Sequence, residues 1–340
     1  MREPPRIAEE QLRVCVQDQY NLGPVTLEFL PLGHDYDAGV CRAVSEQETA
    51  YLLKITSRPL YEPRCLVPRY LYDQGIASVV APIRTRSGAL WTLLSEWTVI
   101  IYPWISGDSR LTGMTDEQWK QVGTIFKHIH QVMPPPVGFE SLRKETFDPG
   151  EYIRWVCAFE TQHVRTKGGD AVERALRSCW IAHQSTINTV LTSLEKLARV
   201  LQSRTLPYVI CHGDLHARNL IRDQAGRVFV IDWDEVLLAP KERDFLFVRP
   251  PHAAAFYQGY GQAEIDWVAL TYFLWERVVQ DLIECTRNVW FRPEWGEASR
   301  LEAIQLLEVI LAQDNVHISA AYQASAHLPT DLTVRSRKKS

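Results

Sequence analysis

The 340-residue sequence lacks the features that mark several classes of protein. Its seven cysteines include no Cys-x-x-Cys pair, and such an odd, unpatterned set argues against a disulfide framework and against a zinc site. Segment 1–11 is polar, so no signal peptide is visible, and no uncharged apolar run reaches membrane-spanning length. These absences predict a cytoplasmic protein in a reducing environment, without a membrane partner.

The sequence also lacks a strong excess of charge of either sign. Lys and Arg number 37 against 41 Asp and Glu, which gives a net charge of −4. Without a large basic field, nucleic acid is not an expected partner. Apolar residues make up 46% of the chain, as in an ordinary soluble globular protein, and 340 residues are long for one core. We therefore expect two lobes; the sequence indicates no oligomeric state.

Strand patterns dominate the first third of the chain, after an amphipathic helix expected at 7–20. A second helix is expected at 62–74, where Pro68 should kink or split it. Six short segments are rich in apolar or β-branched side chains and are predicted to be strands: 25–32, 38–45, 49–55, 79–84, 89–94 and 99–102.

Helical patterns dominate after residue 107. They cover 115–133, with Thr115 as N-cap, then 150–203 and 263–326. The order predicts an α+β fold with two lobes and a cleft between them. The predicted parts are an N-terminal lobe, a hinge, a C-terminal lobe and a disordered tail: 1–102, 103–107, 108–330 and 331–340.

Three side chains suited to metal and proton chemistry lie in the motifs His-Gly-Asp-Leu-His-Ala-Arg-Asn (212–219) and Ile-Asp-Trp-Asp (231–234). Asp214 and Asn219 lie five residues apart in a loop. A hairpin turning at 223–226 would then bring Asp232 back close to Asn219. Carboxylate and amide oxygens are ligands that suit Mg²⁺, and Asp214 beside them would accept a hydroxyl proton.

This arrangement matches the needs of phosphoryl transfer, which requires metal neutralisation of phosphate charge and an aspartate that orients the attacking hydroxyl. The spacing Asp-x-x-x-x-Asn is that of kinase catalytic loops. The competing interpretation is a tight turn at His-Gly-Asp with Asp232 as a helix cap.

The two motifs resemble those of the aminoglycoside phosphotransferase and choline kinase superfamily. Ile231 to Glu235, continuing through Leu-Ala-Pro-Lys-Glu-Arg-Asp (238–244), is most similar to the spectinomycin phosphotransferase branch, as are segments 100–103 and 118–121. The resemblance covers nearly the whole chain apart from its termini. It implies a bilobal protein-kinase-like fold and an enzyme that uses ATP and Mg²⁺; the sequence does not separate ATP from GTP.

The resemblance implies roles for the motif residues. Asp214 would be the catalytic base, and Asn219 and Asp232 would bind two Mg²⁺ ions. His212 would pack the catalytic loop, and Asp244 would brace the same loop through backbone amides.

It also implies a nucleotide site in the N-terminal lobe. Lys54 would pair with the α- and β-phosphates, although an exposed strand lysine is the simpler interpretation. Glu62 is the first candidate to orient Lys54, and Glu48 is its competitor.

A loop over the phosphates and a hinge would complete this nucleotide site. Gly33 belongs to the loop 32–37, which has fewer glycines than the protein-kinase pattern. In the hinge, the Pro103 carbonyl would accept from the adenine amino group and the Ile105 N–H would donate to a ring nitrogen.

The implied activity is ATP-dependent O-phosphorylation of an aminocyclitol antibiotic, first of all spectinomycin, giving resistance or self-protection. The amines of such an antibiotic are cationic, so carboxylates of the protein should bind them. Asp234 and Glu235 are the candidates. One alternative is a metabolic kinase of the same fold, acting on choline, an amino alcohol or a sugar. Another is a nucleotide-binding pseudoenzyme or scaffold.

Overall fold

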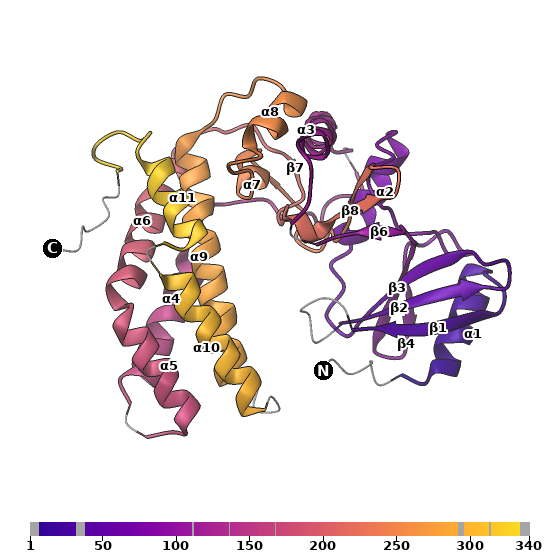
Figure 1. Ribbon diagram of the computed structural model, residues 1–340, viewed down its shortest axis with the longest axis horizontal. Helices are drawn as coiled ribbons and strands as arrows, with labels where there is room; N and C mark the ends of the chain where they lie inside the picture. The colour runs from indigo at the N-terminus through magenta and orange to yellow at the C-terminus, as the bar shows by residue number, and fades with distance from the viewer. Residues whose placement is uncertain are drawn as a thin grey trace. The chain divides into compact units, whose positions relative to one another are not determined.

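The computed structural model describes residues 7–31, 38–110, 112–135, 137–166, 168–291, 296–312 and 314–333 (Figure 1). The chain divides into two compact units. Unit 1 consists of 1–144 with 208–263, and unit 2 of 145–207 with 264–340. A sheet-rich N-terminal region and a mainly helical C-terminal part confirm the α+β class. The lobe boundaries stay a prediction. Of the predicted tail 331–340, residues 334–340 lie outside the described part of the chain.

An antiparallel sheet of five strands forms the first part of unit 1. Its order is β1-β2-β3-β5-β4, and the helix α1 (Glu9–Tyr20) packs against it (Figure 1). Alternate side chains of β2 are buried, as expected for a strand with one face on a core. The strands are β1 (Val25–Leu30), β2 (Ala38–Ser45), β3 (Ala50–Thr56), β4 (Thr92–Leu94) and β5 (Trp97–Pro103).

In this region Pro68 does not split the second predicted helix, and one predicted strand is absent. The helix α2 (Pro63–Asp73) begins with Pro63 in its first turn and continues through Pro68 without a break. Segment 79–84 is not a strand, because Pro82 has no N–H to give to a ladder. Its amides instead bond two different partners, Val80 N–H to the carbonyl of Val230 and Ile83 N–H to that of Ile101.

The second part of unit 1 contains the motif loop and its hairpin. Helix α3 (Asp116–Gln131) begins at Thr115, whose side chain forms the predicted cap with a reciprocal bond to Gln118. The predicted hairpin is present, and it pairs Leu220 with Val230. The other elements here are β6 (Gly107–Asp108), β7 (Val209–Cys211), η2 (Ala217–Asn219), β8 (Leu220–Asp223), β9 (Val228–Val230), β10 (Leu237–Ala239), α7 (Glu242–Phe245) and α8 (Ala253–Tyr260).

All regular elements in the described part of unit 2 are helices. The long helix α9 (Trp267–Trp290) buries Tyr272, Phe273 and Trp275 and lies against helices on several sides (Figure 1). None of the described helices is long and apolar enough to cross a bilayer. The remaining helices are α4 (Gly150–Phe159), its π-helical extension η1 (Glu160–Val164), α5 (Ala171–Ala182), α6 (Gln184–Gln202), α10 (Glu297–Leu311) and α11 (Val316–Ser325).

Candidate functional site

One buried carboxylate, that of Asp244, fixes the loop that carries Asp214. Asp244 accepts hydrogen bonds from the backbone N–H of His212 (3.0 Å) and of Gly213 (2.9 Å). Its Oδ2 also lies 3.0 Å from Nε2 of His130, whose other ring nitrogen faces the Tyr260 hydroxyl at 2.8 Å. The predicted bracing role of Asp244 is therefore confirmed, and His130 extends the brace to α3.

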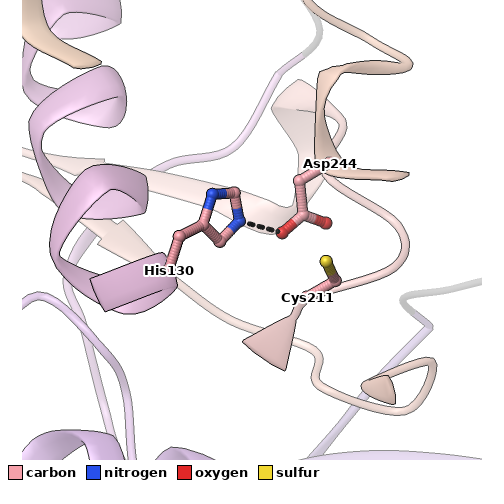
Figure 2. Close-up of side chains that lie close together, drawn as sticks. All are labelled: His130, Cys211 and Asp244. Atoms are coloured by element: carbon pink, nitrogen blue, oxygen red, sulfur yellow. Dashed lines mark hydrogen bonds and ion pairs between the residues drawn. The ribbon is translucent and has the colours of Figure 1, made fainter. Parts of the chain in front are cut away.

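His130, Cys211 and Asp244 lie close enough together to resemble a metal site (Figure 2). Burial, reinforced by the charge of Asp244, raises the pKa of the Cys211 thiol well above its usual range. The Asp244 carboxylate accepts three hydrogen bonds, which compensate for its burial and account for the close approach of these side chains. The cluster is thus a structural brace for the loop.

His212 connects the loop to the strand that precedes Asp232. Its ring is fully buried, and Nε2 donates to the carbonyl of Ile231 at 2.9 Å. Nδ1 accepts from the N–H of Asp214 at 3.3 Å. Both ring nitrogens are used in these contacts, so His212 has the packing role that was predicted for it.

The hairpin brings Asp214, Asn219 and Asp232 to one end of the motif loop. Asn219 Nδ2 donates to the backbone carbonyl of Asp214 at 2.9 Å, and the Asn219 carbonyl accepts from Ile231 N–H at 3.0 Å. Within the described part of the chain, Oδ1 of Asn219 has no hydrogen-bond partner. Asp232 follows with a left-handed φ of 64°, a strained conformation for a residue with a side chain.

His216 adds a contact to the predicted base that the sequence did not reveal. Its Nε2 lies 3.3 Å from Oδ2 of Asp214, and its ring meets the edge of Phe247. Asp214 therefore has a polar neighbour on its carboxylate as well as Asn219 on its backbone carbonyl.

Lys54 lies on β3, and its side chain reaches the carboxylates of Asp232 and Asp234. Its Nζ is 2.8 Å from Oδ1 of Asp232 and 2.7 Å from Oδ2 of Asp234. Burial alone would lower the pKa of this ammonium, but the two carboxylates raise it above its ordinary value. Lys54 thus stays charged, and its side chain is only 15% exposed.

Asp234 lies between two cations. Beside Lys54, it has Arg64 of α2, whose Nη1 lies 3.8 Å from Oδ2. Burial opposes its ionisation, yet Lys54 and Arg64 lower its pKa below the usual value. Glu62 is exposed at the N-cap of α2, so its predicted pairing with Lys54 stays a prediction. Arg64 was missed, although a charged residue among the apolar side chains of this helix was a visible signal.

Glu235, the other predicted substrate carboxylate, is half exposed and pairs with Arg143. Its Oε2 is 3.2 Å from Nη2 of Arg143, which also bonds the Asp234 carbonyl. The Arg143 guanidinium lies over the ring of Tyr61, and the Tyr61 hydroxyl donates to the Val236 carbonyl at 2.8 Å. The loop 234–236 is therefore tied to the start of α2.

The predicted hinge follows the end of β5. Pro103 pairs with Tyr51 at the end of the sheet and is exposed, and Ile105 is half-buried. Among the residues that the structure describes, none bonds the Ile105 N–H, and the adenine contacts of this segment stay a prediction. Gly33 and the rest of 32–37 lie outside the described residues.

Arg222 holds the segment after β5 to the hairpin of β8 and β9. Its guanidinium donates to the backbone carbonyls of Asp108, Arg110 and Thr112, each at 3.1 Å, and to the Asp108 carboxylate at 2.9 Å. This residue was not predicted from the sequence. Strand alternation was the available signal, because Arg222 shares the inward face of β8 with Leu220.

Comparison with known proteins bears on this geometry. A profile of the phosphotransferase enzyme family matches residues 28–278. A search of curated proteins found no match. The chain is similar to the crystal structure of spectinomycin phosphotransferase, APH(9)-Ia, in complex with ADP and spectinomycin, with a TM-score of 0.84. The two are 28% identical, and the match covers 94% of this chain and 99% of that one.

Two further solved structures share the fold alone. One is an aminoglycoside phosphotransferase from Alicyclobacillus acidocaldarius, with a TM-score of 0.61, 16% identity, and coverage of 96% of this chain and 98% of that one. The other is choline kinase LicA from Streptococcus pneumoniae, with a TM-score of 0.58, 16% identity, and coverage of 90% and 99%.

Proposed function

Since the chain belongs to the phosphotransferase enzyme family, we propose that it transfers the γ-phosphoryl group of ATP to a hydroxyl of an aminocyclitol antibiotic of the spectinomycin type. The observation that carries the proposal is the gathering of Asp214, Asn219, Asp232 and Lys54 around one loop. The 28% identity to a spectinomycin enzyme over nearly the whole chain supports the substrate class. The biological role would be resistance or self-protection.

In the proposed reaction, Asp214 orients the substrate hydroxyl and accepts its proton as the oxygen attacks the γ-phosphorus. The bond from that phosphorus to the β–γ bridging oxygen breaks, and ADP leaves with the electron pair. Asn219 Oδ1 and the Asp232 carboxylate are hard oxygen donors that fit Mg²⁺, which would neutralise phosphate charge. Lys54 would pair with the nucleotide phosphates, and the hinge carbonyl of Pro103 and N–H of Ile105 would bind adenine.

On the acceptor side, the exposed carboxylate of Glu235 is the better placed of the two predicted residues for a substrate amine. It would exchange its contact with Arg143 for the ligand. Asp234 is already paired with Lys54 and Arg64, so its substrate role stays a prediction that these contacts do not favour.

The test is turnover of the purified protein with MgATP and a panel of spectinomycin, other aminocyclitols, aminoglycosides, choline, amino alcohols and sugars. Release of ADP and the mass of the product identify the acceptor. Phosphorylated spectinomycin is the expected product. Turnover of choline or a sugar alone would replace the proposal with a metabolic kinase, and nucleotide binding without any turnover would favour a pseudoenzyme.

Asp214→Asn tests the assignment of the base. The variant should lose about a thousandfold in kcat, because the amide cannot accept the proton, while its affinity for MgADP stays within about twofold. Asp116→Asn, an exposed aspartate at the start of α3, is the matched control and should keep full turnover. An active Asp214→Asn protein would overturn the assignment.

A further inference from the structure

The carboxylate of Asp234 is held between two basic side chains from different elements. Oδ2 lies 2.7 Å from Lys54 Nζ on β3 and 3.8 Å from Arg64 Nη1 on α2. The side chains of Lys54 and Arg64 are 15% and 7% exposed, and that of Asp234 is 27% exposed. A carboxylate so enclosed is poorly available to a soluble amine.

Lys54 needs a carboxylate partner if it is to be held at a fixed position. In protein kinases a glutamate on the helix after the lysine strand supplies this partner. Here the buried charged residue on that helix is Arg64, which cannot pair with a lysine, while Glu62 is exposed at the helix N-cap. The two carboxylates that meet Lys54 come instead from the loop after β9, and one of them, Asp234, lies between Lys54 and Arg64.

We propose that Asp234 is a positioning residue that holds Lys54 for the nucleotide phosphates, with Arg64 fixing Asp234 from its other side. This inference rests on the proposed function, because it assigns Lys54 to the nucleotide. It gives the helix α2 the role of orienting the lysine through an intermediate carboxylate instead of by direct contact.

The two carboxylates around Lys54 then have different roles. Asp232 is the more exposed, at 46%, and its Oδ1 lies 2.8 Å from Nζ. Asp234 is less exposed and has Arg64 as a second partner. Arrival of nucleotide phosphates would replace the contact of Lys54 with Asp232, whereas the contact with Asp234 persists and keeps the ammonium in place.

The experiment measures the dissociation constant of MgADP by calorimetry, without any acceptor, together with KM for ATP and for the acceptor. Asp234→Asn should raise the MgADP dissociation constant and KM for ATP about tenfold and leave the acceptor KM within about twofold. Asp234→Glu should recover part of the affinity. Glu28→Gln, which removes an exposed carboxylate near Arg42 on the same sheet, should change none of these constants.

A double-mutant cycle separates positioning from general stabilisation. If Asp234 acts through Lys54, then Lys54→Met combined with Asp234→Asn should bind MgADP no more weakly than Lys54→Met alone. Additive losses would overturn the proposal. So would an Asp234→Asn protein with a raised acceptor KM and unchanged MgADP binding, which is the signature of a substrate carboxylate.

The remaining outcomes also decide between the two proposals. If Asp234→Asn does not fold, Arg64→Gln removes the contact of the same carboxylate with α2 and should also weaken MgADP binding. Wild-type protein that binds MgADP but phosphorylates no acceptor would refute the proposed function while the binding cycle still tests Asp234. Wild-type protein that binds no nucleotide would overturn both.

Discussion

At the scale of single residues, Asp244 shows how the loop that carries Asp214 is fixed. Its carboxylate has no solvent exposure. Hydrogen bonds from two backbone amides and from the ring of His130 compensate for the burial of its charge. A buried anion is tolerated only where such donors surround it. Removing the carboxylate would leave all three donors unsatisfied in a place that water does not reach.

Asp244→Ala should therefore lower the free energy of unfolding by about 3 kcal/mol or more, because unpaired buried polar groups cost about 1–3 kcal/mol each. Urea unfolding measures this loss. Asp116→Ala is the matched control, since Asp116 also pairs with a histidine, His252 at 3.1 Å, but its side chain is 78% exposed. That variant should lose less than about 1 kcal/mol. Equal losses in the two variants would contradict the importance of burial.

The sequence predicted the grouping of residues that stand in recognisable spacing and missed contacts between distant segments, such as that of Asp234 with Lys54 and Arg64. Asp214, Asn219 and Asp232 were found because a loop and a hairpin bring near neighbours in the chain together. Arg64 lies 170 residues before Asp234, and no local pattern connects the two. Contacts of this kind depend on how distant elements pack, which single-residue chemistry does not encode.

At the scale of elements, the loop that carries Asp214 passes very close to the chain that follows Asp234. Gly213 has φ +85°, and a Cβ placed there would lie 2.3 Å from the carbonyl oxygen of Glu235. Gly226, in the turn between β8 and β9, has a similar φ of +78° but open space around it. The two glycines share the same backbone requirement and differ only in their surroundings.

Alanine at these two positions separates the cost of conformation from the cost of contact. Gly226→Ala should lose about 1 kcal/mol, the usual penalty of a left-handed alanine. Gly213→Ala should lose at least about 2 kcal/mol more, because backbone atoms on both sides must move, and it should also weaken MgADP binding. Thermal unfolding measures the loss of stability, and calorimetry measures the affinity for MgADP. Equal destabilisation by the two variants would show that the loop can move away from Glu235.

Elements with a clear period were predicted well, and short or interrupted ones were not. Strands β1, β2 and β3 and helix α3 were found within a few residues, because burial on one face enforces a regular pattern. The strands β6 and β10 have two and three residues, too few for a period to appear. Pro68 failed as a breaker, since the apolar face of α2 stays buried on both sides of it.

At the scale of the whole molecule, the chain forms unit 1 from two separate segments. Every described residue proposed for nucleotide, metal or proton chemistry belongs to this unit. The sequence predicted two parts but could not assign 145–207 to the same unit as 264–340. That grouping arises from the packing of α9 on α4, α5 and α6, which are distant in sequence.

Binding of MgADP should therefore slow amide hydrogen exchange in unit 1. A ligand present at a hundred times its dissociation constant stabilises the bound state by about 2.7 kcal/mol, so amides that exchange only after release should slow about a hundredfold. The affected peptides should contain β3, with Lys54, and the loop and hairpin from β7 to β9. Interior amides of α9 should exchange at the same rate with and without the nucleotide.

ADP with a chelator in place of Mg²⁺ is the control, and protection should fall because Asn219 and Asp232 then lack the cation that joins them to the phosphates. Protection that appeared in α9 while β3 remained unchanged would place the nucleotide away from Lys54 and remove the basis for the proposed reaction.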